Sequence, residues 1–208
     1  MRQTPLILAL LFVATSVMSA EKHWVHEDPA KLCASVKDKD LCADLLSIRD
    51  RDQIARYDAL NHPDDKNLEE VIRKVDKENL ERIDAIIQKH GWPGTSLVGE
   101  KGSGSAWTVI QHADLATQKA YLPVMVKAAD GGELSWALLA TTIDRIQVRE
   151  GKPQTYGTQF HQVNGELVPE RIEDETHVDE RRKKVGLQPL AEYAALMKEM
   201  YARPANPK

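Results

Sequence analysis

Polar side chains that could do acid–base chemistry gather around the stretch from His90 to Asp114. His112 lies in this stretch, and its imidazole titrates near neutral pH, so it is the candidate general base. A glycine-rich segment precedes it, with glycines at positions 99, 102 and 104. Such a segment leading into a helix can hold an anion on its free N–H groups, although a capped helix start explains the same residues. The glycine spacing matches no nucleotide-binding motif, so no cofactor is predicted.

A metal centre is an alternative use of the same stretch. His112 and Asp114 could supply two ligands and His90 a third. On a continuous helix, however, His112 and Asp114 point about 200° apart. We therefore predict no metal site. A histidine held by a backbone carbonyl is a further, purely structural alternative for His112.

Two consecutive predicted helices direct more polar side chains toward the interior. Asp52 falls within the apolar stripe of the first helix, and Arg56 lies at its edge. Asn79 and Arg82 occupy the corresponding places on the second helix. Charged groups in such positions are paired inside the core or directed into a cavity. We predict that these four side chains are shielded and close together, as a structural network or as the floor of a ligand site.

Arg145 is predicted to lie on a buried side of its helix, with no acidic residue three or four positions away. Its counter-charge must come from Asp52, from Asp114 or from a ligand. A pocket for an anionic ligand would use Arg145 together with Lys152. The predicted ligand-binding set is Asp52, Arg56, Asn79, Arg82, Gln111, Asp114, Arg145, Lys152, Gln154, Tyr156 and Gln159, with His112 as the base.

The elements that must position these residues are mainly helices. Helical periodicity is found over residues 39–60, 65–89, 133–149, 179–185 and 189–201. Another helix is predicted to begin near Ser103 or Ser105 and to continue past Gln118, with a second run after Pro123. A strand from Lys152 and a turn at Asn164-Gly165 predict a hairpin over about residues 153–169, with Gln154 and Tyr156 on one face. The predicted fold class is mainly α: a single-domain helical bundle with one small β-hairpin.

The first 20 residues are typical of a secretory signal peptide. Arg2 is followed by an apolar run that ends at Val13, and small residues stand at Ser19 and Ala20. There is no cysteine at the cleavage point for a lipid anchor, and no later apolar run could span a membrane. We expect a soluble mature protein in the periplasm or outside the cell. Its parts would be a cysteine-containing extension (21–40), the helical domain (41–201) and a flexible tail (202–208).

Cys33 and Cys42 are the only cysteines in the chain. An even pair in an exported protein predicts a disulfide. Metal binding is disfavoured because no third ligand lies nearby, and a redox role because the spacing is not Cys-x-x-Cys. The formal net charge of −4, without a basic block, argues against nucleic acid as a partner.

The chain resembles a family of bacterial proteins that carry a domain of unknown function and occur in exported and unexported forms. The motifs that carry the resemblance are Asp52-Gln53 with Arg56, Asn79 with Arg82, His90-Gly-Trp-Pro93, Ser96-Leu-Val-Gly99, Trp107, Gln111-His-Ala-Asp114, Asp144-Arg145, Gly151-Lys-Pro-Gln154, Tyr156-Gly-Thr-Gln159, and Val178-Asp-Glu-Arg-Arg182 with Val185-Gly-Leu187. The resemblance begins at about Leu41 and implies no established activity. The preceding cysteine segment departs from the family. Because the motifs coincide with the inward polar groups, the resemblance favours a site over a structural network.

Two classes of function remain open on the sequence. The first is an enzyme or a binder of a small anionic ligand, with a polar pocket between the helices and the hairpin. The second is a periplasmic binding or inhibitor protein, for example an immunity-type protein, that acts on a protein partner without catalysis. No nucleophile elbow or zinc-protease motif decides for the enzyme. The sequence does not identify a substrate.

Overall fold

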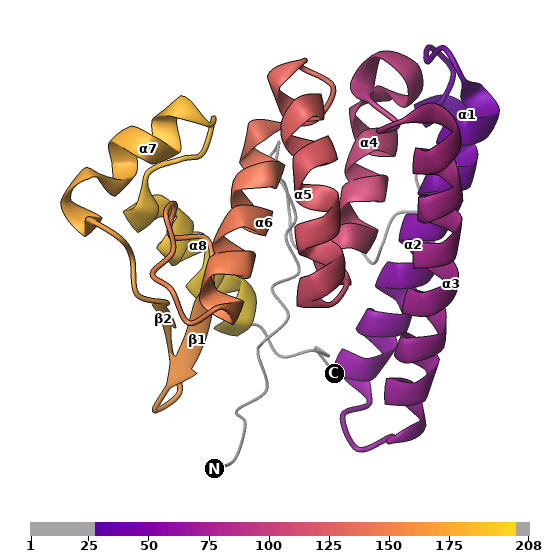
Figure 1. The fold of residues 1–208 in the computed structure, drawn as a ribbon. Coiled ribbons are helices and arrows are strands. Elements are labelled where there is room, and N and C mark those ends of the chain that lie inside the picture. Colours follow the sequence, from indigo (N-terminus) through magenta and orange to yellow (C-terminus); the bar gives the residue numbers. More distant parts are fainter. Residues whose placement is uncertain (1–27, 203–208) are drawn as a thin grey trace.

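The computed structural model describes residues 28–202 (Figure 1). The elements in chain order are α1 (Pro29–Leu32), α2 (Lys39–Asn61), α3 (Asn67–His90), α4 (Thr95–His112), α5 (Leu115–Asp130), α6 (Trp136–Arg149), β1 (Phe160–Val163), β2 (Glu166–Pro169), the 3₁₀ helix η1 (Glu175–His177), α7 (Val178–Lys184) and α8 (Leu190–Ala202). The fold is mainly α with one small antiparallel hairpin, as predicted. The predicted signal peptide and most of the predicted tail lie outside the described residues.

Helices α2 to α6 stand side by side, and the hairpin, α7 and α8 lie beyond α6 (Figure 1). Helix α2 contacts both α3 and α4, and α5 contacts α6. The core between these helices is aliphatic, with fully buried Leu45, Ile83, Ile110, Met125 and Leu139. A separate small cluster joins the hairpin to α8. Within residues 28–202, no helix has both the length and the apolar character needed to cross a membrane.

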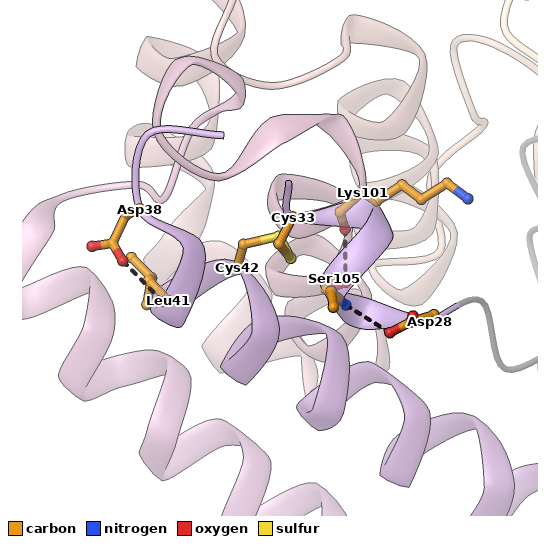
Figure 2. Close-up of a disulfide and its surroundings, with 8 residues drawn as sticks. Asp28, Cys33, Asp38, Leu41, Cys42, Lys101 and Ser105 are labelled. Atoms are coloured by element: carbon orange, nitrogen blue, oxygen red, sulfur yellow. Dashed lines mark hydrogen bonds between the residues drawn. A yellow bond between two sulfur atoms is a disulfide. The ribbon is translucent and has the colours of Figure 1, made fainter. Parts of the chain in front are cut away.

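The predicted disulfide is present between Cys33 and Cys42 (Figure 2). Their Cα atoms are 5.9 Å apart, and both side chains are buried in the main core. The bridge joins the end of α1 to the first turn of α2, where the Asp38 side chain accepts a hydrogen bond from the Leu41 N–H at 3.0 Å. The N-terminal extension is thereby attached to the bundle.

The glycine-rich segment is part of a helix, which corrects the prediction of a loop there. Helix α4 begins at Thr95, and only Gly99, with φ of 74°, interrupts it. Gly102 lies inside the helix, where a Cβ would come within 2.8 Å of the Val98 side chain, so the close packing favours glycine there. The predicted anion-binding turn at these glycines is therefore not formed. At the actual start of the helix, Ser96 N–H donates to the Glu133 carboxylate, Oε2, at 2.9 Å.

A second correction concerns the helix predicted to continue through Gln118. Helix α4 ends at His112, and α5 begins after Asp114, whose side chain accepts a hydrogen bond from Thr117 N–H at 2.8 Å. Asp114 is therefore an exposed helix cap, the usual role of aspartate at this position. Pro123 lies inside α5 on its exposed side, where water can replace the missing hydrogen bond.

Residues 155–159 form a loop and not the predicted strand, and Gln154 makes only an isolated bridge, with Ile172. The strands pair from Phe160 opposite Pro169 to Val163 opposite Glu166. In the preceding loop, the N–H groups that a strand would give to a partner are taken by the Asp144 carboxylate on α6. The strand alternation predicted for Gln154 and Tyr156 therefore does not apply. The hairpin is seven residues shorter at its N-terminal end than predicted.

Candidate functional site

The ring of His112, at the end of α4, faces Asp52 on α2. His112 Nδ1 lies 2.9 Å from Asp52 Oδ1, and the two side chains are only 5% and 1% exposed. The other ring nitrogen, Nε2, has no hydrogen-bond partner within residues 28–202, yet it is not one of the fully enclosed unpartnered atoms there. A neutral imidazole that donates from Nδ1 to the carboxylate presents its lone pair at Nε2. This is the arrangement of a histidine base oriented by a carboxylate.

Asp52 belongs to a longer row of charged groups. It accepts a hydrogen bond from Gln53 Nε2 at 2.6 Å and pairs with Arg56 Nη1 at 3.2 Å. Arg56 Nη2 in turn donates to Asp76 Oδ1 on α3 at 2.8 Å. We call the row Asp76–Arg56–Asp52–His112 the charge chain. It runs from the 33%-exposed Asp76 to the buried imidazole.

Asp76 and Gln53 belong to this site but were not among the predicted site residues. Asp76 lies at the border of the apolar stripe of α3, four residues after Ile72 and three before Asn79, and is half-buried, so its helical spacing was an available signal. The motif Asp52-Gln53 was a possible signal for the glutamine.

Arg145 on α6 approaches the same end of α4 and is 1% exposed. Its Nη1 donates to Gln111 O at 3.2 Å, and its Nε donates to Gln159 Oε1 at 3.2 Å. No carboxylate of residues 28–202 lies within ion-pair distance, so neither Asp52 nor Asp114 supplies the predicted counter-charge. Burial lowers the pKa of Arg145 to about 10, which leaves it cationic at neutral pH. A buried guanidinium with only neutral partners is an unneutralised positive charge beside His112.

Gln111 connects α4 to its neighbours. Its Oε1 accepts from Thr142 Oγ1 at 2.8 Å, and its carbonyl accepts from Gln118 Nε2 at 2.8 Å. Trp107 Nε1 donates to the same threonine hydroxyl at 2.9 Å. Gln111 Nε2 and Gln118 Oε1 remain buried without partners. Buried polar atoms of this kind are commonly satisfied by water or by a ligand.

Gln154 and Gln159 serve mainly to shape the loop before the hairpin. Gln159 N–H donates to Gln154 Oε1 at 2.8 Å, and Gln154 Nε2 returns a hydrogen bond to Gln159 O at 3.0 Å. Half-buried Tyr156 offers its carbonyl to Arg182 Nη1 at 2.6 Å. Arg182 is fully buried and stacks on the Tyr193 ring at 4.9 Å. Of this loop, only Gln159 contacts Arg145 directly.

The structure does not bring every candidate residue to the site. Asp52, Arg56 and Asn79 are buried as predicted, but Arg82 is 58% exposed and pairs with Asp44 at 2.8 Å. Asn79 donates to Ile48 O, which places it at the α2–α3 contact. Arg82 lies three residues after Asn79, on the exposed side of α3, and its guanidinium donates to the Asp44 carboxylate on α2.

Lys152, predicted to bind an anion together with Arg145, lies at the surface. It pairs with Glu150 at 2.7 Å, on the exposed turn that follows α6. A groove of about 430 Å³ lies elsewhere, between the start of α2 and the end of α3, with Asp38, Asp44, Arg82 and His90 among its lining residues. In the part of the chain that the structure describes, no group of three His, Cys, Asp or Glu residues is placed to hold a metal ion.

The buried position of His112 predicts a pH dependence of stability. Burial lowers the pKa of His112 below 6.5, and the hydrogen bond to Asp52 opposes this shift. Because the unfolded chain then binds the proton more readily, the stabilising contribution is complete above pH 6.5 and is lost as the pH falls toward the folded-state pKa. Between about pH 7.5 and 5, wild type should lose more unfolding free energy than His112→Gln, by up to about 1.4 kcal/mol per pH unit. Denaturant titrations at each pH measure this, and parallel curves would contradict it.

Comparisons with known proteins give a family but no characterised relative. No curated protein and no solved structure matches the chain significantly. Residues 39–205 match a family of unknown function, DUF6624. The match begins with the first residue of α2 and includes every member of the charge chain, together with Gln111, Arg145 and Gln159. The chain therefore belongs to the DUF6624 family, and the disulfide-linked helix α1 lies before the family domain.

Proposed function

We propose that this protein binds a small anionic ligand at the end of α4 and acts on it with His112 as general base. The observation that carries the proposal is the 2.9 Å contact between Asp52 Oδ1 and His112 Nδ1, which leaves Nε2 without a hydrogen-bond partner among residues 28–202. The same contact stabilises the imidazolium that forms when Nε2 takes a proton. Binding without catalysis would use the same groups as hydrogen-bonding partners.

The positive charge of Arg145 supports an anionic ligand. Its hydrogen-bond acceptors, Gln111 O and Gln159 Oε1, are neutral, so its charge is not cancelled by a paired carboxylate. Gln111 directly precedes His112, which places the guanidinium against the backbone that carries the base. Among the described residues, no hydroxyl or thiol is hydrogen-bonded to His112. The base would therefore act on the ligand or on a bound water, and not on a protein nucleophile.

We further propose that the protein works in the periplasm or outside the cell. The sequence pattern of the first 20 residues supports export. The Cys33–Cys42 bridge also supports it, because disulfides persist in oxidising compartments.

Arg145→Met tests the ligand role of this residue. The substitution strands no carboxylate, and Gln111 O keeps its hydrogen bond from Gln118. Gln159 Oε1 loses its donor, and the loss is offset because a desolvated guanidinium is removed. We expect the free energy of unfolding to change by less than about 2 kcal/mol. Small molecules retained by purified wild type and variant are then compared by mass spectrometry, and the variant should retain at least about tenfold less.

The control for this experiment is Arg82→Met, which removes an exposed guanidinium from the α2–α3 surface. It should leave ligand retention unchanged. A fall in unfolding free energy well above the expected range for Arg145→Met would show that Arg145 is a structural residue. Equal retention by all three proteins would also contradict the proposed ligand site.

A second candidate is a binding or inhibitor protein, and one observation favours it. Ile54, Tyr57 and Leu60 are exposed along one side of α2, and Val71 is exposed on α3. They belong to the last part of α2 and the first part of α3, on both sides of the turn that joins the two helices. Exposed apolar side chains that gather in one region are typical of protein-binding surfaces. Here the charge chain would only organise the fold.

A further inference from the structure

We propose that Asp76 is a positioning residue for His112: it holds the Arg56 guanidinium in an orientation that makes no hydrogen bond to Asp52, and thereby controls how strongly Asp52 attracts the imidazole proton. The proton affinity of the base is then controlled in part from α3, where Asp76 forms the partly exposed end of the charge chain. The inference rests on the proposed function for its importance. Its geometry and its test do not require a ligand.

The two contacts of Arg56 differ in quality. Nη2 donates a well-formed hydrogen bond to Asp76 Oδ1 at 2.8 Å. Nη1 lies 3.2 Å from Asp52 Oδ1, but neither Nη1 nor Nε makes a hydrogen bond of good geometry. Arg56 is buried, so the two carboxylates fix where its guanidinium lies. The guanidinium is thus hydrogen-bonded to Asp76, whereas its contact with Asp52 is an ion pair without a hydrogen bond.

A change at Asp76 would therefore be felt at His112. Without the Asp76 carboxylate, the guanidinium can turn to Asp52 and make the hydrogen bond that it now lacks. Asp52 would then be more fully neutralised and would attract the His112 proton less strongly. The loss of the Asp76 charge itself acts in the same direction, because a nearby anion favours the imidazolium.

The charged groups around His112 come from three helices. Asp52 and Arg56 belong to α2, Asp76 to α3 and Arg145 to α6. Asp52 favours the protonated imidazole, whereas Arg56 and Arg145 disfavour it. Burial raises the pKa of Asp76, although Arg56 opposes the shift. Asp76 is therefore neutralised at a higher pH than an ordinary aspartate, which makes it a suitable point of control.

The test is a histidine NMR titration of the full chain, with the His112 signal assigned by its loss in His112→Gln. Asp76→Asn should lower the pKa of His112 by about half a pH unit or more, a threefold or greater loss of proton affinity. Asp44→Asn is the matched control. Asp44 on α2 also forms an ion pair with an arginine of the neighbouring helix, Arg82 on α3, at 2.8 Å, but it lies outside the charge chain. It should leave the His112 pKa unchanged.

A double-mutant cycle shows whether the effect passes through Arg56. Arg56→Gln should raise the His112 pKa, which also brings the titration into range if wild-type His112 stays neutral down to acid unfolding. In that background, Asp76→Asn should have at most about half its effect. An undiminished effect, or a folded Asp76→Asn protein whose His112 titrates as in wild type, overturns the inference.

Asp52→Asn separates failure of this inference from failure of the proposed function. If Asp52→Asn lowers the His112 pKa and Asp76→Asn does not, the Asp52–His112 pair stands and only the role of Asp76 is lost. If Asp52→Asn also leaves the titration unchanged, the pair itself is not formed in solution. The proposed base and its control then fail together.

Discussion

Asp144→Ala should lower the free energy of unfolding by about 3–5 kcal/mol, the largest loss that we expect from a single substitution. The Asp144 carboxylate is fully buried on α6 and accepts four hydrogen bonds. They come from the N–H groups of Thr155, Tyr156 and Thr158 and from the Thr158 hydroxyl, at 2.8–2.9 Å. Alanine leaves all four donors without this acceptor. Burial raises the pKa of Asp144 and the four donors oppose the shift, so its removal also relieves a desolvation cost.

Denaturant unfolding of Asp144→Ala and wild type measures this loss. Asp114→Ala is the matched control, since Asp114 also accepts a backbone hydrogen bond but is exposed at the start of α5. It should cost only about 1 kcal/mol, the usual value for a helix cap. Equal losses in the two variants would show that the loop after α6 does not depend on the buried carboxylate.

The second large effect is expected from the disulfide. Replacing Cys33 and Cys42 by alanine should lower the free energy of unfolding by about 2–3 kcal/mol. The bridge closes a short loop, with a sequence separation of 9, and restricts the unfolded chain. Because both sulfur atoms lie in the main core, their removal also takes away apolar contacts with that core.

Unfolding of wild type with and without a reducing agent, beside the double variant, checks this expectation. The reducing agent should destabilise wild type and leave the variant unchanged. Equal stability of oxidised wild type and the variant would mean that the bridge does not stabilise the folded protein. A mass measurement under non-reducing conditions confirms that the starting material is bridged.

The features that depend on short-range patterns could be predicted from the amino-acid sequence alone. Apolar periodicity gave the helices corresponding to α2 and α3 within two residues at each end. It also predicted that Asp52, Arg56 and Asn79 are buried, since side chains at helical spacing lie on the same face of the helix. The Asn164-Gly165 turn of the hairpin and the pairing of the two cysteines follow from equally local rules.

The partner that each polar group takes depends on contacts between distant parts of the chain. Residues 155–159 continue a predicted strand, but the Asp144 carboxylate, more than ten positions earlier, accepts hydrogen bonds from three of their N–H groups and holds them as a loop. Arg56 and Arg82 have similar positions relative to the apolar stripes of their helices. Arg56 is nevertheless buried between two aspartates, whereas Arg82 is exposed to solvent. Asp76 joins the charge chain through a contact twenty residues away, from α3 to α2. Such partners are fixed by how the helices pack. Hydrogen bonds and ion pairs form between groups a few ångströms apart in space, and positions along the sequence do not give those distances.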